Sequence, residues 1–227
     1  MNLFIFNSSI GRKLIMSLSG LFLIVFLLVH LLINSLLLIG PEAFQAGCEF
    51  MEQPFIVIMV PVLAAGFVVH IIYAFWLSYQ NVKARGNVAY ASGKKSETTT
   101  WASKNMLVLG LIVLGVLGLH LSHFWAEMQL KHLTGSDAVL ASEAYELVAI
   151  TFRNPLIGVL YIVWYWALWF HLTHGFWSAL QSVGLNNSVW YPRLKFIGTV
   201  FATIIAVGFT IITAFFLFGF DRCCHLN

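Results

Sequence analysis

The stretch LIMSLSGLFLIVFLLVHLLINSLLLI, residues 14–39, decides the fold class of this chain. It contains no charged residue, and it is longer than the ~20 apolar residues that an α-helix needs to cross the hydrocarbon core of a bilayer. In lipid the backbone polar groups must be satisfied within the segment itself, which favours a helix. Residues 14–39 therefore predict a transmembrane helix that carries one histidine, His30.

Four further apolar runs of similar length follow along the 227 residues. Hydrophobic residues make up 60% of the chain and charged residues only 9%, whereas a soluble domain carries about 25% charged residues. We therefore expect a single all-α integral membrane domain over residues 1–227, in a multi-pass protein of the cell inner (cytoplasmic) membrane. Its bundle of five transmembrane helices is predicted at approximately 14–39, 54–80, 105–127, 155–182 and 196–219.

The charged residues are divided unevenly between the predicted loops. Nine of the twelve basic residues lie on the side of the N-terminus, and eight of the nine acidic residues lie on the opposite side. By the positive-inside rule the N-terminus is expected in the cytoplasm and the C-terminus outside. The net charge of +3 then needs no nucleic-acid-binding surface. The basic loop 86–100, with Lys94 and Lys95, is a predicted docking surface for a cytoplasmic partner. The outer loop 128–153 is predicted to hold a short helix before Pro155.

Six of the eight histidines fall within the predicted spans, where an ionisable side chain is costly and raises a functional hypothesis by default. Counted from the cytoplasmic ends at 1.5 Å per residue, His30 and His120 lie about 23 Å deep, and His70 and His171 about 16 Å deep. Paired imidazoles from two helices at one depth are what a six-coordinate haem iron requires. Because the chain has no C-x-x-C-H motif, the haems should be of b type. The sequence thus predicts two haem b groups, an outer one on His30 and His120 and an inner one on His70 and His171.

Three other interpretations of the histidines explain the pattern less well. A single intramembrane histidine is often satisfied by a backbone carbonyl, but four of them on four helices are poorly explained as separate accidents. Zinc favours ligands that converge tetrahedrally on one point. A proton-coupled transporter with a histidine relay is a different class, and it predicts an internal repeat or broken helices. No repeat is evident, and Pro61 in the second predicted span is the only central proline that could break a helix. His123 and His174 each lie three residues after a predicted ligand, on the same helix face, and are secondary candidates.

Two motifs resemble a known family. SSIGRKLIMSLSGLFLIVFLLVH at 8–30 and FHLTHGFWSALQSVG at 170–184 look like the dihaem cytochrome b membrane anchor of succinate:quinone oxidoreductases and quinol:fumarate reductases. The resemblance covers essentially the whole chain, with one ligand histidine on each of the first four helices. It implies a flavoprotein subunit that interconverts succinate and fumarate, an iron–sulfur subunit on the cytoplasmic face, and a quinone site in the membrane. It also favours His171 over His174, where some members carry asparagine, and His120 over His123.

The quinone site that this resemblance implies lies near the outer haem, where a glutamate exchanges protons with the quinone ring. Glu49 and Glu52, in the loop between the first two helices, are the candidates, and menaquinone is the expected substrate. The chain has no flavin or dicarboxylate motif, so we expect an electron-transfer subunit that does not oxidise succinate alone. The cytochrome b anchor of a hydrogenase or a formate dehydrogenase is the nearest alternative. The sequence leaves the direction of the succinate–fumarate reaction open.

Overall fold

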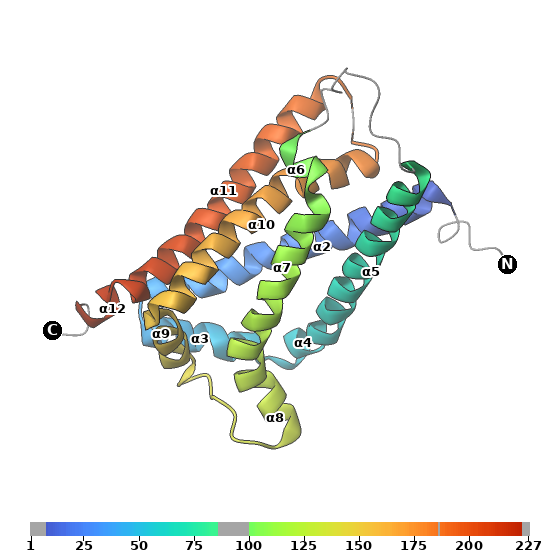
Figure 1. The fold of residues 1–227 in the computed structure, drawn as a ribbon. Helices are drawn as coiled ribbons and strands as arrows, with labels where there is room; N and C mark the ends of the chain where they lie inside the picture. Colours follow the sequence, from blue (N-terminus) through green and yellow to red (C-terminus); the bar gives the residue numbers. More distant parts are fainter. Residues whose placement is uncertain (1–7, 86–99, 186, 224–227) are drawn as a thin grey trace. The chain divides into compact units, whose positions relative to one another are not determined.

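Five long helical spans dominate the computed structural model, which describes residues 8–85, 100–185 and 187–223 (Figure 1). Within these ranges the secondary structure is helical and contains no strand. This confirms the predicted all-α class. The long elements are α2 (Ser9–Ser35), α5 (Met59–Arg85), α7 (Met106–His120) with its continuations η2 (Leu121–Leu130) and α8 (Lys131–Thr134), α10 (Pro155–Ser182), and α11 (Trp190–Leu217).

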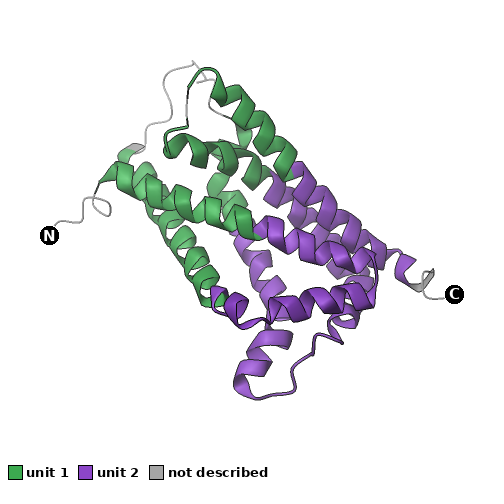
Figure 2. Ribbon diagram, turned by 180° about the vertical axis from the view of Figure 1, so that it is seen from behind, with its two compact units in different colours: residues 1–26, 60–110, 170–202 green, residues 27–59, 111–169, 203–227 purple. Residues whose placement is uncertain are grey.

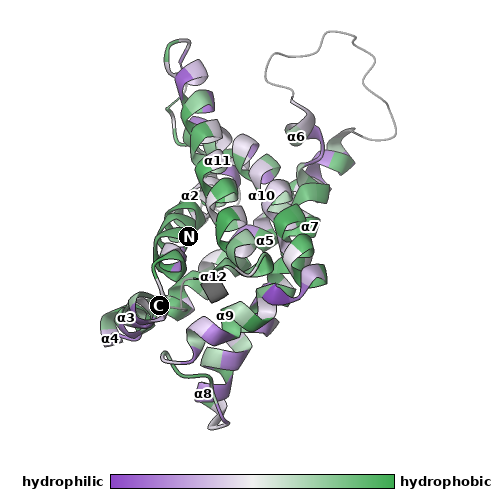
Figure 3. Ribbon diagram, turned by 90° about the vertical axis from the view of Figure 1, so that its left-hand side faces the viewer, coloured by the Kyte–Doolittle hydropathy of each residue, from purple (hydrophilic) through white to green (hydrophobic). Residues whose placement is uncertain are grey.

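Each of the five spans is long and apolar enough to cross a membrane. They cover 28 to 31 residues, which at 1.5 Å per residue exceeds the ~30 Å of a hydrocarbon core. Hydrophobic residues follow the long helices, and hydrophilic residues are drawn at α3, α8 and α9 and also near α6 and at the upper end of α11 (Figure 3). The number of predicted spans is thereby confirmed. Their bounds are Ser9–Leu38, Pro54–Ala84, Met106–Thr134, Pro155–Ser182 and Trp190–Leu217.

Side-chain caps explain why the helices begin outside the apolar runs or at their edges. The Ser8 hydroxyl accepts a hydrogen bond from the Gly11 amide at 3.0 Å, so α2 begins several residues before the predicted start. The Asn187 side chain accepts from the Trp190 amide at 2.8 Å, which starts α11 six residues early. At α10 the Asn154 side chain accepts from the Leu156 amide at 3.0 Å. Polar N-caps satisfy amides that have no partner inside the helix, so helix starts follow caps rather than hydropathy.

Short helices fill the connections between the spans. One of them, α9 (Ala144–Arg153), confirms the short helix predicted before Pro155. Another, α3 (Pro41–Met51), lies in a connection for which no helix was predicted. It begins with a proline, whose fixed φ and missing amide hydrogen suit the first helical position. The remaining short elements are η1 (Leu36–Leu38), α4 (Pro54–Val57), α6 (Trp101–Lys104) and α12 (Phe220–Cys223).

The chain divides into two compact units (Figure 2). Each unit is assembled from three separate segments of the chain, and α2, α7, α10 and α11 each contribute residues to both. Unit 1 comprises residues 1–26, 60–110 and 170–202, and unit 2 comprises residues 27–59, 111–169 and 203–227.

Close helix approach inside each unit depends on glycine. In unit 1 a Cβ atom at Gly198 would lie 2.9 Å from the Phe176 ring, and in unit 2 a Cβ atom at Gly208 would lie 2.8 Å from the Leu31 side chain. Both distances are shorter than carbon–carbon contacts allow, and small residues at such points are typical of membrane helices. A larger residue at Gly198 would collide with Phe176, and a larger residue at Gly208 would collide with Leu31.

Candidate functional site

The structure brings the four predicted ligand histidines together as two pairs. His30 of α2 faces His120, the last residue of α7, with ring centroids 5.7 Å apart. His70 of α5 faces His171 of α10, with centroids 6.3 Å apart. The two rings of each pair are steeply inclined, at 89° and 67°. All four side chains are half-buried.

Each pair lies within a single compact unit. His30 and His120 belong to unit 2, and His70 and His171 belong to unit 1. The members of a pair are separated by about 90 to 100 residues in the sequence, so only the folded arrangement of the helices joins them.

The Ser19 hydroxyl helps to define the state of the His70 ring. Its single hydrogen is donated to the Met16 carbonyl oxygen at 3.0 Å, and its oxygen lies 3.4 Å from His70 Nδ1. The hydroxyl oxygen is therefore placed to accept from Nδ1–H, which leaves the lone pair of Nε2 free for a metal. A Cβ atom at the neighbouring Gly20 would make an ordinary van der Waals contact with this ring, 3.4 Å from His70 Cε1.

Aromatic rings surround His120. Its ring centroid lies 5.2 Å from Phe124, 5.9 Å from Trp164 and 6.1 Å from Tyr161. These rings exclude water from one side of the pair and supply close, shape-defining contacts.

The partner His30 packs against an aromatic ring and an amide. Its centroid lies 5.6 Å from the Phe209 ring. The Asn34 side-chain amide, one turn along α2, lies 3.4 Å from Nδ1 of His30 and donates to the His30 carbonyl oxygen at 2.8 Å.

The two secondary histidines have different surroundings from the pairs. His123 lies in η2, a π-helical segment, and its Nδ1 shares a hydrogen bond of 3.0 Å with the Tyr161 hydroxyl. His174 packs edge-on against Trp177, with centroids 5.0 Å apart. Neither one takes the place of its neighbour, His120 or His171, in the paired contacts described above.

The pairs fit a group that is held between two imidazoles. Metal–nitrogen bonds of about 2 Å on opposite sides of one iron, with about 1 Å from each nitrogen to its ring centre, separate the centroids by about 6 Å. The observed 5.7 Å and 6.3 Å lie close to this value. Nδ1 of His120, of His171 and of the secondary His174 is buried without a hydrogen-bond partner in the described part of the chain. When Nε2 of a histidine binds a metal, Nδ1 carries the ring hydrogen, so these Nδ1 atoms do not distinguish the paired rings from His174.

The side chains that could bind a metal occur as separate histidine pairs and not as larger clusters. In residues 8–85, 100–185 and 187–223 no three His, Cys, Asp or Glu side chains lie close enough to hold one metal ion together. Two imidazoles per site match an iron that takes its other four ligands from a porphyrin, whereas zinc sites in proteins use three or four protein ligands.

The glutamates predicted for the quinone site lie on α3 and at its end, in the same unit as His30 and His120. Glu49 and Glu52 are both exposed, and the Glu49 carboxylate accepts from the Gln45 amide at 2.8 Å. Burial raises the pKa of the neighbouring Cys48 thiol to about 11, with smaller contributions from the charges of Glu52 and Glu49. The carboxylates at this end of α3 therefore contribute to the raised pKa of the buried Cys48 thiol.

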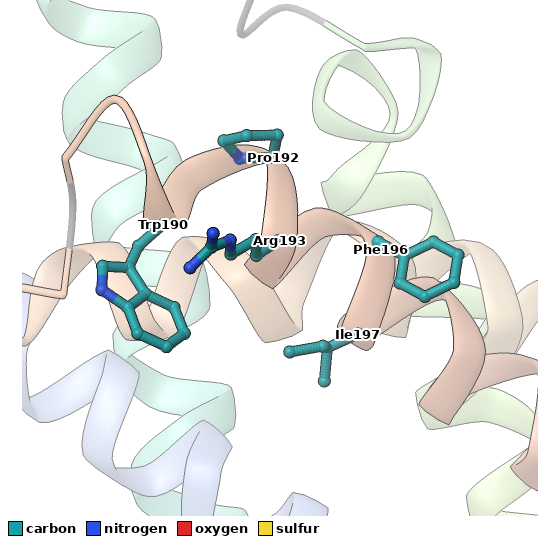
Figure 4. Close-up of a pocket in the computed structure, with 5 residues that line it drawn as sticks. All are labelled: Trp190, Pro192, Arg193, Phe196 and Ile197. Atoms are coloured by element: carbon teal, nitrogen blue, oxygen red, sulfur yellow. The ribbon is translucent and has the colours of Figure 1, made fainter.

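A separate hollow of about 430 Å³ lies on the surface of α11 (Figure 4). It is apolar, except that the Arg193 guanidinium lies over the Trp190 ring, 5.4 Å from its centroid. None of the six intramembrane histidines lines it. Its residues are Trp190, Pro192, Arg193, Phe196 and Ile197.

The chain is 25% identical over 198 residues to the succinate dehydrogenase cytochrome b558 subunit of Bacillus subtilis. The alignment covers 86% of this chain and 89% of that protein. The chain is similar to a succinate dehydrogenase cytochrome b subunit. This similarity confirms the resemblance that the two sequence motifs indicated. No protein-family model matches the chain, and no solved structure matches it significantly.

Two residues beside the pairs were not identified from the sequence. Ser19 is one of several small polar residues in the first apolar run, and Tyr161 lies in the aromatic run 161–170, which is typical of core or lipid-facing positions. The positions of Ser19 and Tyr161 along their own helices do not indicate that either residue contacts a histidine on another helix.

Proposed function

We propose that this chain is the haem-carrying membrane anchor of a succinate:quinone oxidoreductase or quinol:fumarate reductase. It transfers electrons between a membrane quinone and an iron–sulfur subunit, which serves the flavoprotein that interconverts succinate and fumarate. The observation that carries this proposal is the presence of two separate histidine pairs in a five-span chain similar to a succinate dehydrogenase cytochrome b subunit.

The two pairs would hold two haem b groups, one on His30 and His120 and the other on His70 and His171. With two histidines at each site, no coordination position would be left for oxygen or substrate, so the bound group would supply one-electron transfer. The chain's own side chains set the surroundings. Ser19 Oγ lies 3.4 Å from His70 Nδ1, where it would accept from Nδ1–H and orient the ring, and aromatic side chains lie against His120.

The catalytic subunits would dock on the cytoplasmic side, which the positive-inside rule assigns to the N-terminus and to the basic loops. Lys94 and Lys95 of the predicted docking loop lie outside the described residues. Exposed Lys83 and Lys104 border that loop in unit 1. A basic surface accelerates and orients association with an acidic partner, and salt weakens this effect.

Charge reversal tests this surface. Lys83→Glu combined with Lys104→Glu should reduce co-purification of the iron–sulfur and flavoprotein subunits, more strongly at low salt than at high salt. Lys131→Glu, at the opposite end of a span, is the matched control and should leave co-purification unchanged. Full recovery of both partners with the doubly reversed chain at low salt would exclude this surface as the contact.

The quinone site is proposed beside the outer pair, with menaquinone as the substrate and Glu49 or Glu52 as the proton acceptor. Oxidation of a quinol releases two protons with its two electrons, and a carboxylate beside the quinone would take up one of these protons. Glu49→Gln and Glu52→Gln should leave the haem content unchanged. One of them should slow quinone turnover by at least about tenfold, within the range expected for loss of a general base. Normal quinone turnover in both variants would show that neither Glu49 nor Glu52 is the proton acceptor.

The decisive experiment for the function as a whole is an absorption spectrum of the purified membrane complex, reduced first by succinate and then by dithionite. We expect sharp b-type bands, two haems for each chain, and partial reduction by succinate. Complete absence of haem would refute the proposal. Haem together with a co-purifying hydrogenase or formate dehydrogenase would favour the nearest alternative instead.

A further inference from the structure

Tyr161 connects both histidines at the end of α7. Its side chain is completely buried, at 0% exposure, and its hydroxyl shares the 3.0 Å hydrogen bond with His123 Nδ1. The Tyr161 and His123 rings are nearly parallel, at 24°, with centroids 5.9 Å apart. The same tyrosine ring lies against His120, with centroids 6.1 Å apart.

The change of helix type after His120 makes this arrangement possible. His120 is the last residue of the α-helical part, and π-helical η2 begins at the next residue. An α-helix has 3.6 residues per turn, whereas the i→i+5 bonds of a π-helix give a wider turn. Three residues therefore cover a smaller part of a turn, and His123 is rotated away from the direction of His120. It meets the Tyr161 hydroxyl on α10.

The Tyr161 ring is further immobilised by other aromatic side chains. Phe152 and Trp164 lie edge-on to it, with centroids 5.2 Å and 5.6 Å away. With its hydroxyl bonded and its ring enclosed, Tyr161 presents a fixed surface to His120. A ring held by packing and by a hydrogen bond keeps a metal ligand in one orientation.

We propose that Tyr161 is a positioning residue for His120. Its hydrogen bond to His123 fixes the tyrosine ring, and the tyrosine ring fixes the rotation of the His120 imidazole plane. The inference rests on the proposed function, in which His120 is an iron ligand, and it assigns a structural task to His123. The orientation of axial imidazole planes affects the electronic structure of a low-spin ferric haem and its midpoint potential.

Tyr161→Phe tests the proposal because it keeps the ring and removes only the hydroxyl. The variant complex is compared with the unmodified complex by electron paramagnetic resonance of the oxidised haems and by redox titration. We expect a shift of the largest g value and of the midpoint potential for one haem. The signals of the other haem, held by His70 and His171 in the other unit, should stay unchanged and serve as the internal reference.

Tyr165→Phe is the matched control. Tyr165 lies one turn further along α10, is buried to 5% exposure, and shares a hydrogen bond of 3.0 Å with the Thr213 hydroxyl. Its loss removes a comparable buried bond from the same unit, so any general destabilisation should be similar while both haem signals stay in place.

A second variant keeps the test decisive if Tyr161→Phe does not assemble. His123→Asn removes the other partner of the bond and should produce the same change at the same haem. Unchanged haem signals in either assembled variant, or equal shifts in Tyr165→Phe, would overturn the positioning role. Absence of both haems from the unmodified complex would instead refute the proposed function.

Discussion

Removal of Arg153 should destabilise the protein more than removal of any surface charge. The Arg153 guanidinium donates to the Asp221 carboxylate, and this hydrogen bond is the main cause that raises the pKa of Arg153. Asp221 is 1% exposed and Arg153 26% exposed. Arg153 also bonds the Glu146 carboxylate at 2.9 Å, but Glu146 is 56% exposed. In Arg153→Met, a buried carboxylate would therefore lose its cation, while the exposed one would be solvated.

The expected magnitude follows from this burial. Breaking a buried ion pair by removing one partner costs about 3–5 kcal/mol. In a chain of this size each kcal/mol lowers the unfolding temperature by roughly 2–4 °C, so Arg153→Met should lower it by roughly 6–20 °C. The measurement is thermal unfolding of the detergent-solubilised complex at a fixed scan rate, followed by the loss of haem absorbance and of helical circular dichroism.

Two further variants isolate the cause. Combining Arg153→Met with Asp221→Leu removes the uncompensated charge and should restore most of the lost stability, because hydrophobic replacements of buried ion pairs are often neutral. Lys131→Met breaks the partly exposed pair with Glu127, whose side chains are 42% and 35% exposed, and should cost less than about 1 kcal/mol. The reasoning would be refuted if Arg153→Met and Lys131→Met had equal effects, or if the double variant were no better than Arg153→Met.

Three other predictions concern single side chains. His171→Ala should halve the haem content measured by the pyridine haemochrome assay, whereas His174→Asn should keep both haems; the opposite result would exchange their roles. Ser19→Ala should raise the midpoint potential of the haem at His70, because loss of the hydrogen bond weakens electron donation by the imidazole ring. The shift should be at most about a few tens of millivolts, since the bond is long at 3.4 Å. A lowered midpoint potential would contradict this. The raised pKa of Cys48, about 11, keeps its thiol protonated at neutral pH, so alkylation followed by mass spectrometry should be slow at pH 8 and accelerate as the pH approaches 11. Rapid modification at pH 8 would show that Cys48 is not buried.

The fold was accessible from the sequence because lipid imposes a simple rule on composition. A run without charges that is long enough to cross the bilayer forms a helix, so the span at 155–182 was predicted at the bounds of α10. The starts of α2 and α11 were misplaced because Ser8 and Asn187 set them through polar caps, which hydropathy does not register. The helix α3 was missed because it is too short to span and contains polar residues.

The histidine pairs were partly accessible, because counting along straight helices gives the depth of a residue. The depths grouped His30 with His120 and His70 with His171, the same partners that lie in ring contact in the structure. Counting contains no information on which face of one helix meets which face of another. The contact of Ser19 with His70 and the bond of Tyr161 to His123 depend on such faces, and the second depends also on the change of helix type in η2.

The interleaving of the two units limits how this protein can be shortened during evolution. Each unit takes one piece from the beginning, one from the middle and one from the end of the chain. A terminal deletion long enough to remove His30 or His171 therefore also removes parts of both units, and the remaining chain would not retain a complete unit. A descendant with a single histidine pair would have to arise by substitution of His30, His70, His120 or His171 within a full-length chain rather than by loss of a terminal segment.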